Sequence, residues 1–204
     1  MYTPKLYRED DRTRILEFLQ QNDFATVVAH DGERSVASHL LVEVIENSEG
    51  WFINSHMSRA NPLWKIFERN SEILVIFQGP HTYITPTWYN HINVPTWNYQ
   101  AVHLYGRPQL VTEREEAYQL LKRLTDRYEK SDRYRMETLP PDYVEKEMKG
   151  VMAFQVEVAQ IQANYKLSQN RDDEDYWNIV SHLEAREDEP SHGVAEAMRR
   201  QRPR

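Results

Sequence analysis

Three segments of the chain carry residue types that could bind an anion or a planar ligand. The first is HMSRANP at 56–62, in which Arg59 stands just before a helix expected to begin at Asn61. A cation beside the free N–H groups of a helix N-terminus is suited to a phosphate. Ser38 and His39 lie on a neighbouring predicted strand and could reach the same place. The alternative is that Arg59 only faces solvent.

The second segment is KLSQNR at 166–171, which again precedes a predicted helix. Lys166 and Arg171 supply two cations, and the polar side chains between them are Ser168, Gln169 and Asn170. This set could bind an anion, because cations and amide donors both form hydrogen bonds to phosphate oxygens. The alternative is an ordinary turn and helix cap.

The third segment, residues 73–106, contains no Asp, Glu, Lys or Arg, although 28% of the chain is charged. A window of this length should hold roughly nine or ten charges at ordinary composition. Its polar-tipped aromatic and imidazole side chains are Tyr83, Trp88, Tyr89, Trp97, Tyr99, Tyr105, His81, His91 and His103. Such rings combine a flat apolar surface with a polar tip, which suits a planar ligand or a subunit interface. The segment could therefore be core or subunit interface, or it could form a ligand pocket. The two interpretations are compatible, since a pocket can lie between subunits.

Several other chemistries find no support in the residues. The chain has no cysteine, and its eight histidines show no metal-binding spacing, so we expect no metal site. No nucleophile elbow or phosphate-cradling glycine loop is present, and no catalytic residue can be named. His103, on a strand with period-two alternation, is expected to be a barrel histidine with satisfied hydrogen bonds.

Charge and hydropathy indicate the location of the protein and the kinds of partner it can bind. With 25 basic and 32 acidic residues, the net charge is −7, which argues against a broad nucleic-acid-binding face. No apolar run is long enough to span a membrane, and MYTPKLYREDDR at the start has no signal-peptide core. We expect a cytoplasmic protein without membrane contact.

The elements that position these residues follow from periodicity and turn signals. Strands are predicted at 24–30, 35–46, 51–56, 73–77, 83–85, 98–111 and 151–161. Helices are predicted at 9–22, from 61, at 112–128, at 141–150 and at 172–186. Thr112 and Glu115 form a capping-box pattern, Asp31-Gly32 is a hairpin-turn signal, and the last residues, MRRQRPR, are expected to fray. Many antiparallel strands with few helices indicate a small β-barrel with peripheral helices.

Six motifs together carry a family resemblance. They are MYTPKLYRED at 1–10, SHL at 38–40, RANP at 59–62, FQGPHTYITPTWY at 77–89, VPTWNYQAVHLYG at 94–106 and YKLSQNR at 165–171. They span nearly the whole chain, and the pairing of the two aromatic motifs is specific. The sequence resembles the PaiB family of FMN-binding negative transcriptional regulators.

The resemblance implies a mainly β, antiparallel, FMN-binding split β-barrel, of the flavin-reductase and pyridoxamine-phosphate-oxidase type. It implies a single domain at 1–204 that ends in a helical extension at 172–204, and a homodimer with FMN at the subunit interface. The implied function is negative regulation of degradative-enzyme (protease) production and sporulation. The alternative is an FMN-dependent oxidoreductase, such as a flavin reductase, and a haem-binding split barrel is a further alternative.

Matched to the motifs, the residues expected to bind the cofactor are Arg59 and Lys166 near the phosphate, Ser38, His39, Asn61 and Ser168 as supporting donors, and His81, Trp97 and Asn98 at the ring or its rim. A DNA or regulatory partner is compatible with the family. Because the chain is acidic and shows no helix-turn-helix pattern, we expect any DNA contact to be weak or indirect. The basic tail residues that could touch phosphates are Arg199, Arg200, Arg202 and Arg204.

Overall fold

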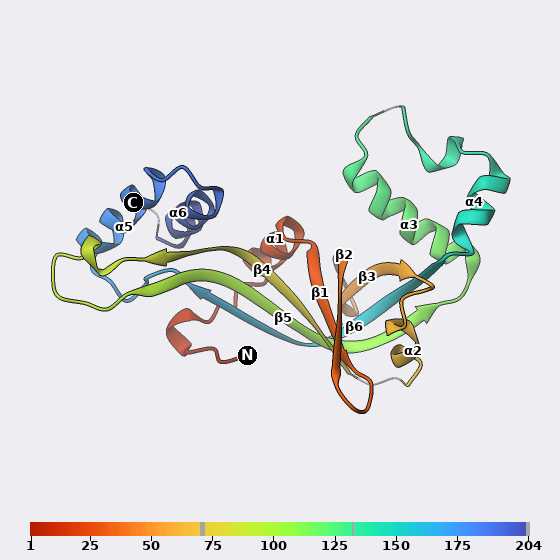
Figure 1. Ribbon diagram of the computed structural model, residues 1–204, viewed down its shortest axis with the longest axis horizontal. Coiled ribbons are helices and arrows are strands. Elements are labelled where there is room, and N and C mark those ends of the chain that lie inside the picture. The colour runs from red at the N-terminus through yellow and green to blue at the C-terminus, as the bar shows by residue number, and fades with distance from the viewer. Residues whose placement is uncertain (70–71, 132, 203–204) are drawn as a thin grey trace. The chain divides into compact units, whose positions relative to one another are not determined.

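Six strands form a barrel in the order β1-β2-β3-β6-β5-β4 in the computed structural model, which describes residues 1–69, 72–131 and 133–202 (Figure 1). The strands are β1 (Phe24–His30), β2 (Ser35–Asn47), β3 (Gly50–Ser58), β4 (Ile73–Ile84), β5 (Thr96–Val111) and β6 (Val151–Lys166). Antiparallel pairing of β1 with β4, at Thr26 and Ile76, closes the barrel. The predicted fold class, an antiparallel barrel with peripheral helices, is confirmed.

In the part of the chain that the structure describes, six α-helices and three short 3-10 turns accompany the barrel. The helices are α1 (Arg12–Gln21), α2 (Leu63–Phe67), α3 (Arg114–Tyr128), α4 (Pro141–Met148), α5 (Asp173–Glu184) and α6 (Glu189–Gln201). The 3-10 turns are η1 (Lys5–Tyr7), η2 (Pro86–Trp88) and η3 (Met136–Thr138). Within the described residues, no helix is both long and apolar enough to cross a membrane.

The contacts divide the chain into two compact units. The first comprises Met1–Phe18, Gln78–Val102 and Gln162–Arg204, and the second comprises Leu19–Phe77 and His103–Ile161. Strands β1 to β3 belong wholly to the second unit, whereas β4, β5 and β6 contribute residues to both. Each unit is described by itself below.

The β1–β2–β3 meander of the second unit follows the sequence closely. Alternate residues of β1 are buried, as period-two apolar spacing dictates, and Val27 is fully buried. In the turn after β1, the Asp31 carboxylate accepts the N–H groups of Glu33 and Arg34 at 2.8 and 2.9 Å. Gly32 adopts φ 111°, a left-handed conformation that glycine tolerates without strain. The predicted hairpin is confirmed.

Helix α3 packs its apolar stripe on the barrel of the second unit. The buried residues Ala117, Leu120 and Leu124 contact Ala153 of β6, with Leu41 and Met148 around them. The predicted helix is confirmed, but the capping box is wrong. Glu113, rather than Thr112, occupies the N-cap position, and no side chain caps the helix there.

The C-terminal helices of the first unit pack side by side (Figure 1). The Tyr176 hydroxyl of α5 donates to the backbone carbonyl of Met198 in α6 at 2.6 Å, and both side chains are fully buried. The last residues, 198–204, were expected to fray. This prediction is wrong as far as residue 202, because α6 extends to Gln201 and buries Met198 and Ala195. Asp188 caps α6 by accepting the Ser191 N–H at 2.9 Å.

Candidate functional site

The start of α2 in the second unit brings Ser38 and Asn61 together. The Asn61 amide Nδ2 donates to Ser38 Oγ on β2 at 2.9 Å, and its Oδ1 accepts the Leu63 N–H at 3.0 Å. The predicted N-cap is nevertheless displaced by one residue, because Pro62 occupies the N-cap position of α2 and Asn61 stands before it. The two side chains that sequence reasoning grouped as supporting donors are hydrogen-bonded to each other.

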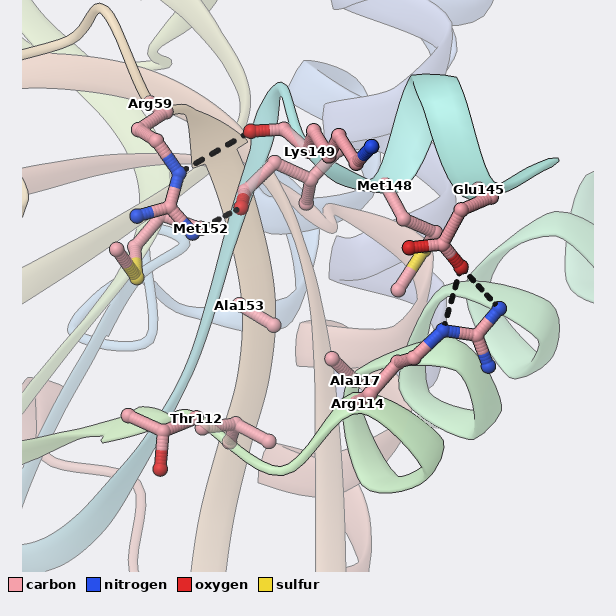
Figure 2. A pocket seen from close by; sticks show the side chains of 11 residues that line it. Arg59, Thr112, Arg114, Ala117, Glu145, Met148, Lys149, Met152 and Ala153 are labelled. Carbon is pink, nitrogen blue, oxygen red and sulfur yellow. Dashed lines mark hydrogen bonds and ion pairs between the residues drawn. The ribbon is translucent and has the colours of Figure 1, made fainter. Parts of the chain in front are cut away.

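Arg59 lies beside them in sequence but directs its guanidinium toward the start of β6. Nε donates to the Lys149 carbonyl at 3.2 Å and Nη2 to the Val151 carbonyl at 3.4 Å (Figure 2). The Arg59 backbone N–H also donates to the Gly150 carbonyl at 2.8 Å. Among the described residues, Nη1 of Arg59 has no hydrogen-bond partner. One edge of this exposed cation is thus held in place, and one nitrogen can still bind an anion.

His39 does not join this group. It follows Ser38 on a strand, and successive strand residues point to opposite faces. Its imidazole stacks on the exposed ring of Phe24, with centroids 6.1 Å apart.

In the first unit, Asn98 and Ser168 form a buried pair. Asn98 Nδ2 lies 2.9 Å from Ser168 Oγ, the hydroxyl can donate to Asn98 Oδ1 at 3.1 Å, and both residues are almost fully buried. Ser168 adopts φ 61°, a left-handed conformation that is rare outside glycine and asparagine. The pair fixes the KLSQN turn to β5. That Asn98 and Ser168 bind a cofactor stays a prediction.

Lys166 lies at the end of β6, before this turn. Its ammonium donates to Thr96 Oγ1 at 2.5 Å and lies 5.9 Å from the centre of the Tyr7 ring. The described residues place no carboxylate in an ion pair with it. Its positive charge therefore stays uncompensated by a direct partner.

The rings of the charge-free segment form an exposed surface on β4 and β5. His81 and Tyr83 lie 6.0 and 6.2 Å from Trp97, measured between ring centroids. Trp97 is 52% exposed and Tyr83 41% exposed. Asn98, the next residue, points to the opposite, buried face, so the structure does not bring Asn98 and Trp97 to one surface.

Two half-buried histidines of the second unit were not proposed as functional from the sequence. Burial lowers the pKa of His56 and of His103 below the ordinary 6.5. Nδ1 of each ring is buried and has no hydrogen-bond partner among the described residues. We expected the hydrogen bonds of the His103 ring to be satisfied, and this expectation is therefore wrong for Nδ1. No spacing pattern identifies these residues, because their burial depends on strand pairing distant in sequence.

The basic tail is largely occupied by ion pairs within the first unit. Arg199 binds the Glu184 carboxylate at 2.6 and 2.9 Å, Arg200 binds Glu196, and Arg202 binds Asp173. Arg204 lies outside the described residues. Over the described ranges, no three His, Asp or Glu side chains gather as a metal-binding group.

Comparison with known proteins gives consistent results. A family model described as "Putative FMN-binding domain" matches residues 1–160. The Bacillus subtilis protein named protease synthase and sporulation protein PAI 2 is 39% identical over 200 residues, covering 97% of this chain and 96% of that protein. A Saccharomyces cerevisiae protein named uncharacterized protein YKL070W is 34% identical over 100 residues, covering 46% of this chain and 59% of that protein.

Two solved structures share the fold. The flavocytochrome Anf3 of Azotobacter vinelandii has a TM-score of 0.65 at 18% identity, covering 84% of this chain and 75% of that one. The FAD and haem binding protein of Mycobacterium smegmatis has a TM-score of 0.59 at 15% identity, covering 78% and 73%. At such identity the likeness concerns the fold alone, which is that of a split β-barrel.

Proposed function

Because the chain belongs to the PaiB family of FMN-binding split-barrel proteins, we propose that it is an FMN-binding negative regulator of protease production and sporulation. The observation that carries this proposal is the 39% identity to the Bacillus subtilis protein over almost the whole of both chains. An alignment of that extent includes the barrel, the KLSQN turn and the C-terminal helices alike.

The chemistry of three side chains near the start of α2 suits the phosphate of FMN. Phosphate oxygens can be bound by the Asn61 amide, by the Ser38 hydroxyl and by Nη1 of Arg59. This Nη1 has no hydrogen-bond partner among the described residues. When bound, FMN would supply a redox-active isoalloxazine, and the protein would supply binding and orientation. We also assign Lys166 to the cofactor, because it belongs to the KLSQN motif.

We expect the regulatory effect to reach DNA indirectly. Three arginines of the basic tail are engaged with carboxylates, and the net charge is −7. Phosphate contacts provide most of the affinity of non-specific DNA binding, and they need uncompensated cations. A protease-gene reporter in cells with and without the chain, combined with a gel shift of its promoter, tests this. We expect lower reporter expression in the cells that contain the chain. We also expect no gel shift of the promoter at physiological salt. An unchanged reporter would contradict the regulatory role, and a tight, sequence-selective shift would contradict the indirect route.

The second candidate is an FMN-dependent oxidoreductase. The exposed, uncharged rings of His81, Tyr83 and Trp97 favour it, because they offer a surface for a planar substrate or cofactor. Oxidation of NADPH by the FMN-loaded protein distinguishes the two. Turnover above that of free FMN supports an enzyme, and its absence supports the regulator. A haem titration of the same preparation tests the remaining alternative.

We also propose that the protein is a homodimer. The exposed large apolar residues of the charge-free segment are Tyr83, Ile92, Val94 and Trp97. A second subunit would cover such a surface without burying an unpaired charge, which would be costly.

A further inference from the structure

A side chain at the C-terminal end of α6 reaches the KLSQN turn (residues 166–170). Arg202, the residue that follows α6, donates from Nη2 to the backbone carbonyl of Gln169 at 3.1 Å and to that of Arg171 at 3.0 Å. All three residues belong to the first unit. A guanidinium carries its N–H donors in one rigid plane, so a single side chain can hold two carbonyls. Arg202 therefore connects the C-terminal helix to the turn.

Helix α5 fixes the position of this guanidinium. Arg202 Nη1 donates to Asp173 Oδ1 at 2.8 Å, and the guanidinium carbon lies 4.1 Å from the centre of the Tyr176 ring. The Arg202 backbone N–H donates to the Met198 carbonyl at 3.0 Å, and Tyr176 and Met198 are both fully buried. Only 27% of the Arg202 side chain is exposed. The donor is thus ordered before it reaches the turn.

The turn needs such bonds, because its own residues satisfy only part of its backbone. The Gln169 side chain closes the turn from within. Its Oε1 accepts the Leu167 N–H at 2.7 Å, and its Nε2 donates to the Tyr165 carbonyl. The carbonyl of Gln169 itself points to Arg202. A segment outside helices and sheets keeps one conformation only where side chains bind its backbone groups.

A neighbouring arginine of α6 shows which contacts of Arg202 are special. Arg199 binds the Glu184 carboxylate at 2.6 and 2.9 Å, and it lies 5.6 Å from the centre of the Trp177 ring. Both arginines therefore join α6 to α5 by an ion pair and a ring contact. Arg202 differs because it also bonds two carbonyls of the KLSQN segment. Joining the two helices does not require those bonds.

We infer that Arg202 is a positioning residue for the cofactor site. It fixes the KLSQN turn, and the turn places Lys166 and Ser168, which the proposed function assigns to FMN. The inference rests on that proposed function. Arg202 does not contact the cofactor itself, since Nη1 is bonded to Asp173 and Nη2 to the turn. The affinity for FMN thus depends on a residue 31 to 33 positions after the carbonyls that it holds.

The first measurement is the dissociation constant of FMN, obtained by quenching of flavin fluorescence. Arg202→Gln should raise it about fivefold to tenfold, because binding groups lose affinity when their supporting contacts are removed. Arg199→Gln is the matched control, since it breaks the ion pair of the same helix that does not reach the turn. Asp173→Asn removes the ion pair of Arg202 and leaves its carbonyl bonds. Both controls should stay within about twofold of the unmodified chain.

The second measurement is amide hydrogen exchange of the FMN-free protein, which reports on the turn without the cofactor. The N–H groups of Leu167 and Arg171 are bonded within the turn. In Arg202→Gln they should exchange at least about fivefold faster, whereas in Arg199→Gln they should exchange as in the unmodified chain. Arg202→Lys keeps the charge without the planar fork, so its FMN affinity should lie between those of Arg202→Gln and the unmodified chain.

Two results would overturn the inference alone. One is an equal FMN affinity of Arg202→Gln and Arg199→Gln in a chain that binds FMN. The other is an unchanged exchange rate of Leu167 and Arg171 in Arg202→Gln. An unmodified chain that binds no FMN would instead overturn the proposed function and this inference with it.

Discussion

Arg59 shows why a residue's role depends on where its side chain is held. From the sequence it stands before a helix, and in the structure its guanidinium reaches two carbonyls at the start of β6, about 90 residues further along the chain. This anchoring reduces the entropy lost when Nη1 binds an anion, since the side chain is already ordered. The same anchoring means that any substitution also removes two hydrogen bonds of the fold.

The first prediction concerns Arg59 and FMN. Arg59→Ala should weaken FMN binding by roughly 1.5–3 kcal/mol, the range for a charge-assisted hydrogen bond, as measured by quenching of flavin fluorescence. Arg107→Ala, which removes an exposed arginine of β5, is the matched control and should bind FMN like the unmodified chain. An affinity unchanged in Arg59→Ala would remove this residue from the FMN site.

The second prediction concerns His56 and His103. Their folded-state pKa values lie below the ordinary 6.5, because burial disfavours the charged imidazolium. As the pH falls below 6.5, the unfolded chain therefore binds protons that the folded chain does not. The stability of the fold should be fully present above pH 6.5 and should decrease as the pH falls toward the folded-state pKa values.

Urea denaturation at a series of pH values between about 7.5 and 5.5 measures this slope. His56→Asn should reduce the slope, since it removes one of the two titrating groups. His39→Asn, the same change at an exposed histidine, is the matched comparison. Identical slopes in His56→Asn and the unmodified chain would show that His56 does not titrate differently in the folded state.

At the scale of elements, the KLSQN turn depends on a polar pair buried under it. Asn98 of β5 and Ser168 satisfy each other, and Asn98 Nδ2 also lies 3.5 Å from Met198 Sδ of α6. Strand, turn and helix are thus joined at one point. The left-handed Ser168 is kept in place by these bonds and by the Arg171 N–H, which donates to its carbonyl at 3.0 Å.

The third prediction tests this connection. Asn98→Ala should lower the free energy of unfolding by about 1–3 kcal/mol, because it leaves the buried Ser168 hydroxyl without its partner. Asn170→Ala, an exposed residue of the same turn, serves as the control and should change the stability by less than about 0.5 kcal/mol. Thermal unfolding followed by circular dichroism compares the two. Equal effects would mean that the pair contributes no more than a surface residue.

The elements also show what sequence patterns can and cannot predict. β1 was predicted at its observed bounds, because its β-branched run ends at the Asp31-Gly32 turn signal. β4 runs through the predicted gap between 73–77 and 83–85, since pairing in the barrel overrides the breakers Gly79 and Pro80. β6 extends beyond the predicted 151–161 to Lys166. α6 was not predicted as a separate helix, although it lies within the helical extension implied at 172–204. Pro190 occupies its first turn, where proline is tolerated.

The candidate site was predictable only in part. The Asn-Pro dipeptide, a local signal, indicated the start of α2 to within two residues, although Pro62 and not Asn61 occupies the N-cap position. A cavity of about 250 Å³ beside Arg59 (Figure 2) was not predicted, because Arg114, Glu145 and Lys149 meet there only through the packing of α3 and α4 on the barrel. No local pattern encodes such contacts.

For the whole molecule, the charge-free segment is the feature that a dimer explains best. Its exposed residues Ile92 and Trp97 would face water in a monomer. Charged residues are depleted at the cores of protein interfaces, and aromatic residues are enriched there. The segment has both properties.

The fourth prediction is that Trp97→Glu combined with Ile92→Glu halves the molar mass measured by light scattering after gel filtration. Burying two carboxylates in an apolar interface costs several kcal/mol. Leu6→Glu, at an apolar residue that is also exposed but lies outside the charge-free segment, should stay dimeric. A monomeric unmodified chain, or a dimer that survives the double substitution, would contradict the proposed interface.

FMN binding is the central claim, and a spectroscopic titration of the purified protein tests it most directly. We expect the flavin absorption of the dialysed complex to correspond to one FMN for each chain, with quenched flavin fluorescence and a raised melting temperature, because a ligand that binds only the folded state stabilises it. A protein that stays colourless after incubation with FMN, and whose melting temperature does not change, would contradict the account.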